Sequence, residues 1–261
     1  MPAPACGSEI ELAAAVTPWP YPRWLAHRGA GKLAPENTLA AFRLGAGLGY
    51  TAFECDIKLS ADGVPFLLHD DALDRTSNGA GTASALPWAD LSQLDAGSWH
   101  SRTFAGEPLP TLQAVAAFVL RNGFSLNIEI KPTLGADVQT GQRVAALADR
   151  LWAGQAVPPL LSSFRPEALA AAQAAAPALP RALLLDTLWS GWFECATELG
   201  CVAVVTQHGL MNTELLNRLR AAGWRALVYT VNGATDAERL LALGLDGLIT
   251  DNLTGFAPAT G

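Results

Sequence analysis

The sequence lacks the features that would place it in a membrane or on a nucleic acid. Half of its 261 residues are apolar, yet no hydrophobic run approaches the roughly 20 residues that span a bilayer. Lysine and arginine number 17 against 24 acidic residues, which gives a net charge of −7, and no basic stripe stands out. We therefore expect no stable membrane insertion and no nucleic-acid partner.

Cysteine is also scarce. The four cysteines show no close paired spacing of a zinc site or a dense disulfide framework: Cys6, Cys55, Cys195 and Cys201. Cys55 and Cys201 fall in apolar strand patterns and are predicted to be buried thiols, which fits a reducing compartment. The N-terminus carries Glu9 and Glu11 without lysine or arginine, so it lacks the basic start of a secretory signal. These features predict a cytoplasmic location.

One stretch carries much of the recognisable chemistry. Residues 53–59 alternate, so Glu54, Asp56 and Lys58 share one face of an extended strand. Buried carboxylates are costly unless a cation or another partner neutralises them. A tight turn follows, and a second apolar run returns His69 beside the acids. Taken alone, the pattern also fits an edge hairpin with solvated acids and a surface histidine.

Two other segments repeat the pattern of an apolar strand that ends in polar side chains. One runs into His27 and Arg28, and residues 125–131 place Glu129 and Lys131 on one strand face. Three such strand ends favour one shared site over three solvated faces.

The order of strand-like runs predicts the fold. They cover 24–28, 52–57, 64–69, 125–130, 160–164, 181–185, 201–206, 225–231 and 246–250. Parallel neighbours need a crossover of a dozen or more residues, and the Asp62-Gly63 turn is far shorter, so 64–69 must return antiparallel to 52–59. The other eight runs alternate with helical patterns. We therefore predict an α/β fold, a TIM (β/α)₈ barrel with a β-hairpin extension and with function at the C-terminal strand ends.

The same rhythm sets the domain limits. Residues 1–22 are rich in alanine and proline and are expected to form a tail across the outside or bottom of the barrel. A single domain should cover 23–261, a length that can bury a full core. Residues 71–110 are rich in Gly, Ser, Asp and Trp and break the strand–helix rhythm, so they predict a small insertion over the C-terminal face.

In such a barrel Glu54, Asp56 and Glu129 converge from adjacent strand ends. Three oxygen donors without histidine or thiolate suit a hard divalent cation, Mg²⁺ or Ca²⁺. The alternative is a salt-bridge cluster with Arg28 and Lys131. Three acids exceed two bases, which favours the metal. Arg28 can then offer paired donors to a phosphate and Lys131 a point charge.

The ordered set of motifs resembles the glycerophosphodiester phosphodiesterase family from Trp24 to Asn252. The strongest matches are His27-Arg28-Gly29, Pro35-Glu36-Asn37-Thr38, Glu54-x-Asp56, His69-Asp70, Asp74-Arg75-Thr76-Ser77-Asn78-Gly79 and Glu129-Ile130-Lys131, with weaker ones at 163–164, 229–232 and 246–251. The resemblance implies the same barrel and metal ligation by the three acids. It also implies that His27 and His69 are the general acid and base, in an order that it leaves open.

Two further residues enter the predicted site through the resemblance. Glu36 could contact the substrate or merely favour the N-terminus of the following helix, and the family motif favours the site. Tyr229 stands where the family usually has tryptophan, and its ring could pack against the glycerol carbons.

These observations predict metal-dependent hydrolysis of a small-molecule glycerophosphodiester to sn-glycerol 3-phosphate and an alcohol. One rival is a lysophospholipase D-like activity on lysophospholipids, which an apolar channel beside the site would favour. Another is a non-catalytic phosphate-ligand binder that keeps the barrel. The head-group alcohol, the choice between direct water attack and a cyclic phosphate intermediate, and the oligomeric state are left open.

Overall fold

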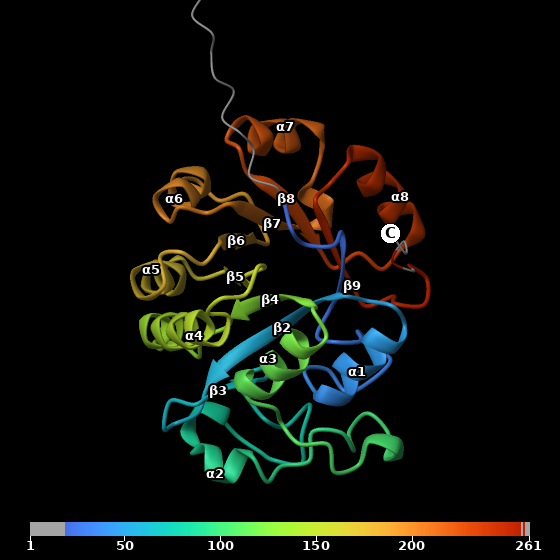
Figure 1. The fold of residues 1–261 in the computed structure, drawn as a ribbon, viewed down its shortest axis with the longest axis vertical. Helices are drawn as coiled ribbons and strands as arrows, with labels where there is room; N and C mark the ends of the chain where they lie inside the picture. The colour runs from blue at the N-terminus through green and yellow to red at the C-terminus, as the bar shows by residue number, and fades with distance from the viewer. Residues whose placement is uncertain (1–18, 257, 259–261) are drawn as a thin grey trace, which may run out of the picture.

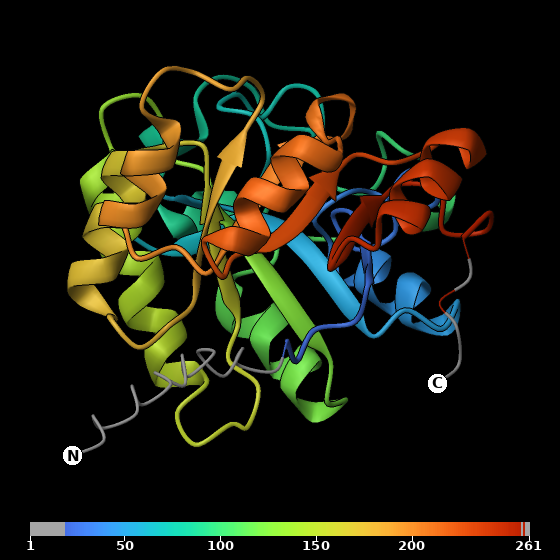
Figure 2. The same cartoon turned by 90° about the horizontal axis from the view of Figure 1, so that it is seen from above.

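The computed structural model describes residues 19–256 and 258, and its strands close into a barrel. Eight parallel strands follow the order β1-β9-β8-β7-β6-β5-β4-β2, and β2 pairs back with β1. The long helices lie around the outside of the strands (Figures 1 and 2). The predicted TIM barrel is confirmed.

The elements have the following bounds. The strands are β1 (Trp24–Ala26), β2 (Ala52–Leu59), β3 (Pro65–Leu67), β4 (Ser125–Ile130), β5 (Leu160–Ser163), β6 (Arg181–Leu185), β7 (Ala203–Gln207), β8 (Arg225–Tyr229) and β9 (Gly247–Thr250). The α-helices are α1 (Leu39–Gly47), α2 (Trp88–Leu91), α3 (Leu112–Arg121), α4 (Asp137–Leu151), α5 (Pro166–Ala175), α6 (Trp192–Glu198), α7 (Thr213–Ala221) and α8 (Ala234–Leu243). Three short 3₁₀ turns span Ala83–Ala85, Arg102–Phe104 and His208–Leu210.

The predicted hairpin is also confirmed. Strand β3 runs antiparallel to β2, with Ile57 opposite Leu67 and Leu59 opposite Pro65. This pairing extends β2 two residues beyond the predicted end at Ile57. Strand β1 ends two residues earlier than predicted, because Arg28 adopts a φ of 51° that a strand does not accommodate.

The insertion has its own small core and lies at the C-terminal end of the barrel, as predicted. Leu73 and Leu91 pack with Phe66 and Leu68 of the hairpin. The imidazole Nε2 of His100 lies 3.0 Å from the carbonyl oxygen of Lys32, in the loop that follows β1. The apolar contacts join the insertion to the hairpin, and the His100 contact joins it to the β1–α1 loop. Figure 1 shows the insertion as a lobe around α2.

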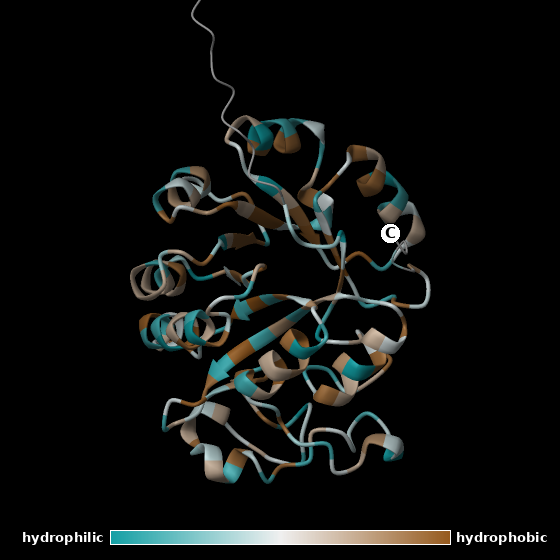
Figure 3. Cartoon of the chain, viewed as in Figure 1, coloured by the Kyte–Doolittle hydropathy of each residue, from teal (hydrophilic) through white to brown (hydrophobic). Residues whose placement is uncertain are grey.

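The core has two layers. Apolar side chains such as Leu25, Leu227 and Ile249 fill the lower barrel interior, and a larger set packs between the strands and the surrounding helices. Figure 3 shows β2 alternating between the hydrophilic and hydrophobic colours, and the surrounding helices also carry both. Among the described residues, no helix is both long and apolar enough to cross a bilayer.

Part of the predicted tail is described. Trp19 and Tyr21 pack against the barrel's interior cluster, and the Tyr21 hydroxyl donates to the carbonyl of Pro158 at 3.0 Å. The prediction for residues 1–18 lies outside the described residues. Cys55 and Cys201 are buried free thiols, as expected.

Helix α1 approaches the site loop so closely that one of its glycines is sterically required. A Cβ on Gly45 would lie 2.2 Å from the carbonyl oxygen of Gly29, whereas a Cβ on Gly47 of the same helix would meet nothing within 4 Å. Elsewhere in a helix, replacing glycine by alanine stabilises, by up to about 1 kcal/mol.

We predict that Gly45→Ala lowers the free energy of unfolding by about 1–3 kcal/mol because the helix and the loop must separate. Gly47→Ala serves as the matched control and should be neutral or stabilising. Urea denaturation of both variants checks this, and equal stabilities would contradict the close approach.

Candidate active site

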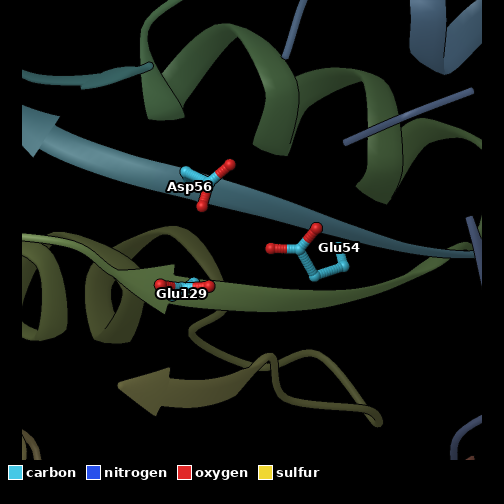
Figure 4. Close-up of side chains that lie close together, drawn as sticks. All are labelled: Glu54, Asp56 and Glu129. Atoms are coloured by element: carbon cyan, nitrogen blue, oxygen red, sulfur yellow. The ribbon is translucent and has the colours of Figure 1, made fainter. Parts of the chain in front are cut away.

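Three carboxylates from neighbouring strands share one small volume. Glu54 and Asp56 lie on β2, Glu129 lies on β4, and Asp56 pairs directly with Glu129 in the sheet register. Oxygen atoms of the three lie within 4.8 Å of one another. All three residues are buried, with exposures of 3%, 1% and 9%. Figure 4 shows Glu54 and Asp56 along β2 and Glu129 on the adjacent strand β4, with the three side chains close together.

Asp56 is well compensated. Lys131 Nζ lies 3.4 Å and Arg28 Nε 3.2 Å from its oxygens. The Asn37 amide donates to Asp56 Oδ2 at 2.8 Å and accepts from the Asp56 backbone N–H at 3.1 Å. Burial would raise the pKa of Asp56, but the positive charges of Lys131 and Arg28 and the Asn37 hydrogen bond hold it below its ordinary value.

Glu54 is less well compensated than Asp56. Its Oε2 accepts from the backbone N–H of Arg28 at 3.1 Å. Its Oε1 is buried and has no hydrogen-bond partner among the described residues. Burial, followed by the charge of Asp56, raises the pKa of Glu54 to about 8. Burial and Asp56 likewise raise the pKa of Glu129.

This donor set fits a hard cation. A buried carboxylate oxygen without a partner is costly, and a divalent cation would satisfy it. Arg28 and Lys131 compensate Asp56, and Lys131 Nζ also lies 2.8 Å from Glu129 Oε1. Glu54 Oε1, in contrast, has no hydrogen-bond partner among the described residues. The salt-bridge alternative therefore leaves Glu54 Oε1 unexplained, and the triad fits a hard divalent cation bound through oxygen.

The loop after β1 is held in a strained backbone conformation beside these acids. Arg28 and Asn37 are the two described non-glycine residues with positive φ, at 51° and 59°. The Asn37 backbone N–H donates to the Arg28 carbonyl at 2.9 Å. Such conformations cost free energy and persist where surrounding contacts fix them. Here the two residues present the Arg28 backbone N–H to Glu54 and the Asn37 side-chain amide to Asp56.

His27 is oriented by a carboxylate at the end of β9. Its Nδ1 lies 2.6 Å from Asp251 Oδ1, and its Nε2 lies 3.8 Å from Glu54 Oε2. Asn232 donates to Asp251 Oδ2 at 2.9 Å and so holds that carboxylate in place. Burial alone would lower the pKa of His27, but Asp251 and Glu54 together raise it.

His69 has a similar neighbour and a different electrostatic setting. Its Nδ1 lies 2.6 Å from Asp70 Oδ1. Burial lowers the pKa of His69, and the charges of Lys131 and Arg28 add to that effect, against the opposing charge of Asp56. The two histidines thus differ in the direction of their pKa shifts.

Glu36 and Tyr229 take different positions. Both carboxylate oxygens of Glu36 accept from arginines: Oε1 from Arg28 Nη1 and from Arg75 Nη2, and Oε2 from Arg75 Nη1, each at 2.8 Å. Tyr229 lines a cavity of about 20 Å³ beside His27 and Glu129. Its hydroxyl donates to the Leu185 carbonyl at 3.3 Å.

Sequence reasoning did not select Asp251, Asn232 or Asn37 as site residues. Asp251 directly follows the buried strand β9, the same placement that drew attention to the other strand ends. Asn37 carried a weaker signal, because asparagine tolerates positive φ better than other non-glycine residues. The distances to His27 and Asp56 follow only from the tertiary structure.

Comparisons with known proteins agree on one family. The family model described as "Glycerophosphoryl diester phosphodiesterase family" matches residues 27–254. A glycerophosphodiester phosphodiesterase from Caldanaerobacter subterraneus is 31% identical over 231 residues, which cover 87% of this chain and 93% of that protein.

Solved structures give the same answer. A phosphodiesterase from Oleispira antarctica, in complex with the product sn-glycerol-3-phosphate, superposes with a TM-score of 0.83 at 34% identity, covering 90% of this chain and 95% of the other. A glycerophosphodiester phosphodiesterase from Agrobacterium tumefaciens has a TM-score of 0.77 at 28% identity, covering 90% and 99%.

The raised pKa of Glu54 predicts how stability depends on pH. Between its ordinary value of 4.5 and about 8, the folded metal-free protein holds a proton that the unfolded chain releases. Stability in chelator should therefore fall as the pH rises through this window, and less steeply in Glu54→Gln.

A divalent cation displaces that proton, so added Mg²⁺ or Ca²⁺ should raise the melting temperature more at pH 8 than at pH 6. A cation present at 100 times its Kd stabilises by about 2.7 kcal/mol. Thermal melts of the unmodified protein and of Glu54→Gln test this. If neither cation changed the melting temperature of the unmodified protein at pH 6 or pH 8, a metal site here would be contradicted.

Proposed function

The chain belongs to the glycerophosphoryl diester phosphodiesterase family, whose members are phosphoric diester hydrolases, and from this premise we propose that it cleaves glycerophosphodiesters to sn-glycerol 3-phosphate and an alcohol. The observation that carries the proposal is the placement of two histidines, each paired with a carboxylate, beside an acidic triad in which Glu54 keeps an unpartnered oxygen. The glycerol phosphate complex of the Oleispira antarctica relative supports the substrate class.

In this proposal Glu54, Asp56 and Glu129 hold Mg²⁺ or Ca²⁺. The bound cation would withdraw charge from a phosphoryl oxygen. Arg28 and Lys131 lie beside the same acids and add positive charge for the phosphate. Glu36 acts on the substrate through Arg28, whose guanidinium it holds, and Tyr229 packs beside the glycerol carbons.

His27 and His69 move the protons. In each ring Nδ1 faces a carboxylate at 2.6 Å, so Nδ1 carries a proton and donates it, which leaves Nε2 for exchange with the substrate. One ring removes a proton from the attacking hydroxyl, and the other delivers a proton to the departing alkoxide. Asp251 and Asp70 keep the two rings in these tautomers.

We predict that His27→Ala and His69→Ala each lower kcat about 10²–10⁴-fold, the usual contribution of a positioned acid or base. His208→Ala is the matched control, because that ring also lies near a carboxylate, Asp236 at 3.6 Å, but outside the triad. Steady-state hydrolysis of glycerophosphocholine measures the effect. Near-normal activity of either variant would remove that histidine from the mechanism.

A nitrophenyl diester separates the two roles. Its leaving group departs without protonation, so the variant that lacks the acid should recover on this substrate and the variant that lacks the base should not. If His27→Ala and His69→Ala both recovered, or both failed to recover, the assignment of one acid and one base would be contradicted.

One observation favours the lysophospholipid rival as a second candidate. Six of the eight exposed large apolar residues in the described part of the chain follow strand ends or lie in the insertion: Leu33, Trp99, Leu134, Val138, Leu188 and Trp189. The cavity beside the triad, at about 20 Å³, has room for little more than one water and cannot admit an acyl chain. Such a chain would have to lie across the rim.

The two candidates differ in their response to Leu188→Asn and Trp189→Asn. A lysophospholipid hydrolase should lose activity on lysophosphatidylcholine in these variants and keep activity on glycerophosphocholine. We expect the first candidate to hold, with glycerophosphocholine cleaved faster than lysophosphatidylcholine by the unmodified protein and both variants unchanged. The reverse order of rates would favour the rival.

A further inference from the structure

One arginine of the insertion binds two carboxylates at the edge of the site. Arg75 Nε donates to Asp70 Oδ2 at 2.6 Å, and Nη2 donates to Asp70 Oδ1 at 3.1 Å. On its other side Nη1 and Nη2 donate to the two oxygens of Glu36, both at 2.8 Å. Four of the five N–H donors of the guanidinium are thus engaged. Arg75 is therefore occupied and is not an open anion-binding group.

Each of these carboxylates continues to a residue of the proposed site. Asp70 contacts His69 Nδ1 at 2.6 Å, and Glu36 accepts from Arg28 Nη1 at 2.8 Å. A continuous chain runs from His69 through Asp70, Arg75 and Glu36 to Arg28. It joins the end of the hairpin, the start of the insertion and the β1–α1 loop.

We propose that Arg75 is a positioning residue that fixes both His69 and Arg28 through these two carboxylates. The proposal rests on the proposed function, because it takes His69 as a proton-transfer group and Arg28 as a phosphate contact. It makes the insertion part of the catalytic apparatus through a residue that touches neither the substrate nor the acidic triad.

Electrostatics support this geometry. The hydrogen bonds from Arg75 lower the pKa of Asp70, and they lower that of Glu36 despite its burial, which acts in the opposite direction. Both carboxylates therefore stay charged and keep their onward contacts to His69 and Arg28 over the whole neutral range.

A purely structural role makes a different prediction. The Arg75 side chain is 45% exposed, and exposed ion pairs typically contribute only about 0–1 kcal/mol to stability. If Arg75 were only such a pair, its removal would change neither stability nor catalysis by much. As a positioning residue it would change catalysis far more than stability, because small misplacements of reacting groups cost up to about 10²-fold in rate.

The two branches of the chain should separate in the kinetics. The Asp70 branch ends on a proton-transfer group, so its loss lowers kcat. The Glu36 branch ends on a phosphate contact, so its loss raises KM. Arg75→Ala should therefore change both parameters, Asp70→Asn mainly kcat and Glu36→Gln mainly KM. Adding Arg75→Ala to the Asp70→Asn/Glu36→Gln double variant should cost little more, since both routes are already broken.

The experiment measures kcat, KM and the melting temperature for Arg75→Ala and Arg75→Lys, with glycerophosphocholine as substrate. Arg165→Ala is the matched control: that arginine is 51% exposed and pairs with Asp137 at 2.6 Å and Glu167 at 3.9 Å, on helices α4 and α5. We expect kcat/KM to fall about ten- to hundredfold in both Arg75 variants. A lysine cannot reproduce the planar double fork. The control should retain activity.

Guanidinium ion added at millimolar concentration provides the decisive readout. The vacated position is half exposed and flanked by two carboxylates, so the ion should restore activity to Arg75→Ala, while potassium at the same ionic strength should not. A protein that was merely destabilised would not recover.

Three results would overturn the inference: Arg75→Lys with unmodified activity, Arg75→Ala no more impaired than Arg165→Ala, or no rescue by guanidinium. Should Arg75→Ala fail to fold, Arg75→Lys alone decides the matter. An unmodified protein that fails to cleave glycerophosphodiesters would instead refute the proposed function, so the two failures are distinguishable.

Discussion

The burial of three carboxylates at one end of the barrel is the constraint on which the rest of the site depends. Like charges in a low-dielectric interior repel strongly, and each must be neutralised by a cation, a hydrogen bond or a proton. Lys131 pairs with both Asp56 and Glu129. Asp56 also pairs with Arg28 and accepts a hydrogen bond from the Asn37 amide. Glu54 accepts from one backbone N–H and lies 3.8 Å from His27, but its Oε1 has no hydrogen-bond partner among the described residues. The site therefore leaves one carboxylate oxygen, Glu54 Oε1, for a cation to satisfy.

The loop between β1 and α1 adopts strained backbone conformations that position donors beside the acidic triad. Two positive-φ residues, Arg28 and Asn37, direct their backbone and side-chain donors at Glu54 and Asp56. The close approach of Gly45 to Gly29 holds helix α1 against the same loop. Strain of this kind is stored where geometry matters for function, and in residues 19–256 both positive-φ residues other than glycine lie in the loop between β1 and α1.

Carboxylates also organise the outer part of the site. Asp251 orients His27 from the end of β9, and Asp70 orients His69 from the end of the hairpin. Each of these carboxylates is anchored in turn, by Asn232 in one case and by Arg75 in the other. The two histidines are thus held by separate supports, one belonging to the barrel and one to the insertion.

The sequence predicted the architecture well because the relevant signals are local. Alternation placed Glu54 and Asp56 on one face, and the short Asp62-Gly63 turn excluded a parallel β3. Strand ends were less accurate where tertiary contacts decide, as at Arg28, whose positive φ ends β1 early.

The supports of the site were harder to foresee. The pairing of His27 with Asp251 joins residues 224 positions apart, and no local pattern specifies which acid meets which histidine. The double occupation of Glu36 by Arg28 and Arg75 is likewise visible only in three dimensions.

The most direct test of the central claim is a crystal structure grown with Ca²⁺ and sn-glycerol 3-phosphate. The account predicts one cation bonded at about 2.3–2.6 Å to an oxygen of each of Glu54, Asp56 and Glu129, with a phosphate oxygen completing the shell. An empty triad bridged only by Lys131 and Arg28, with the phosphate bound elsewhere, would contradict it.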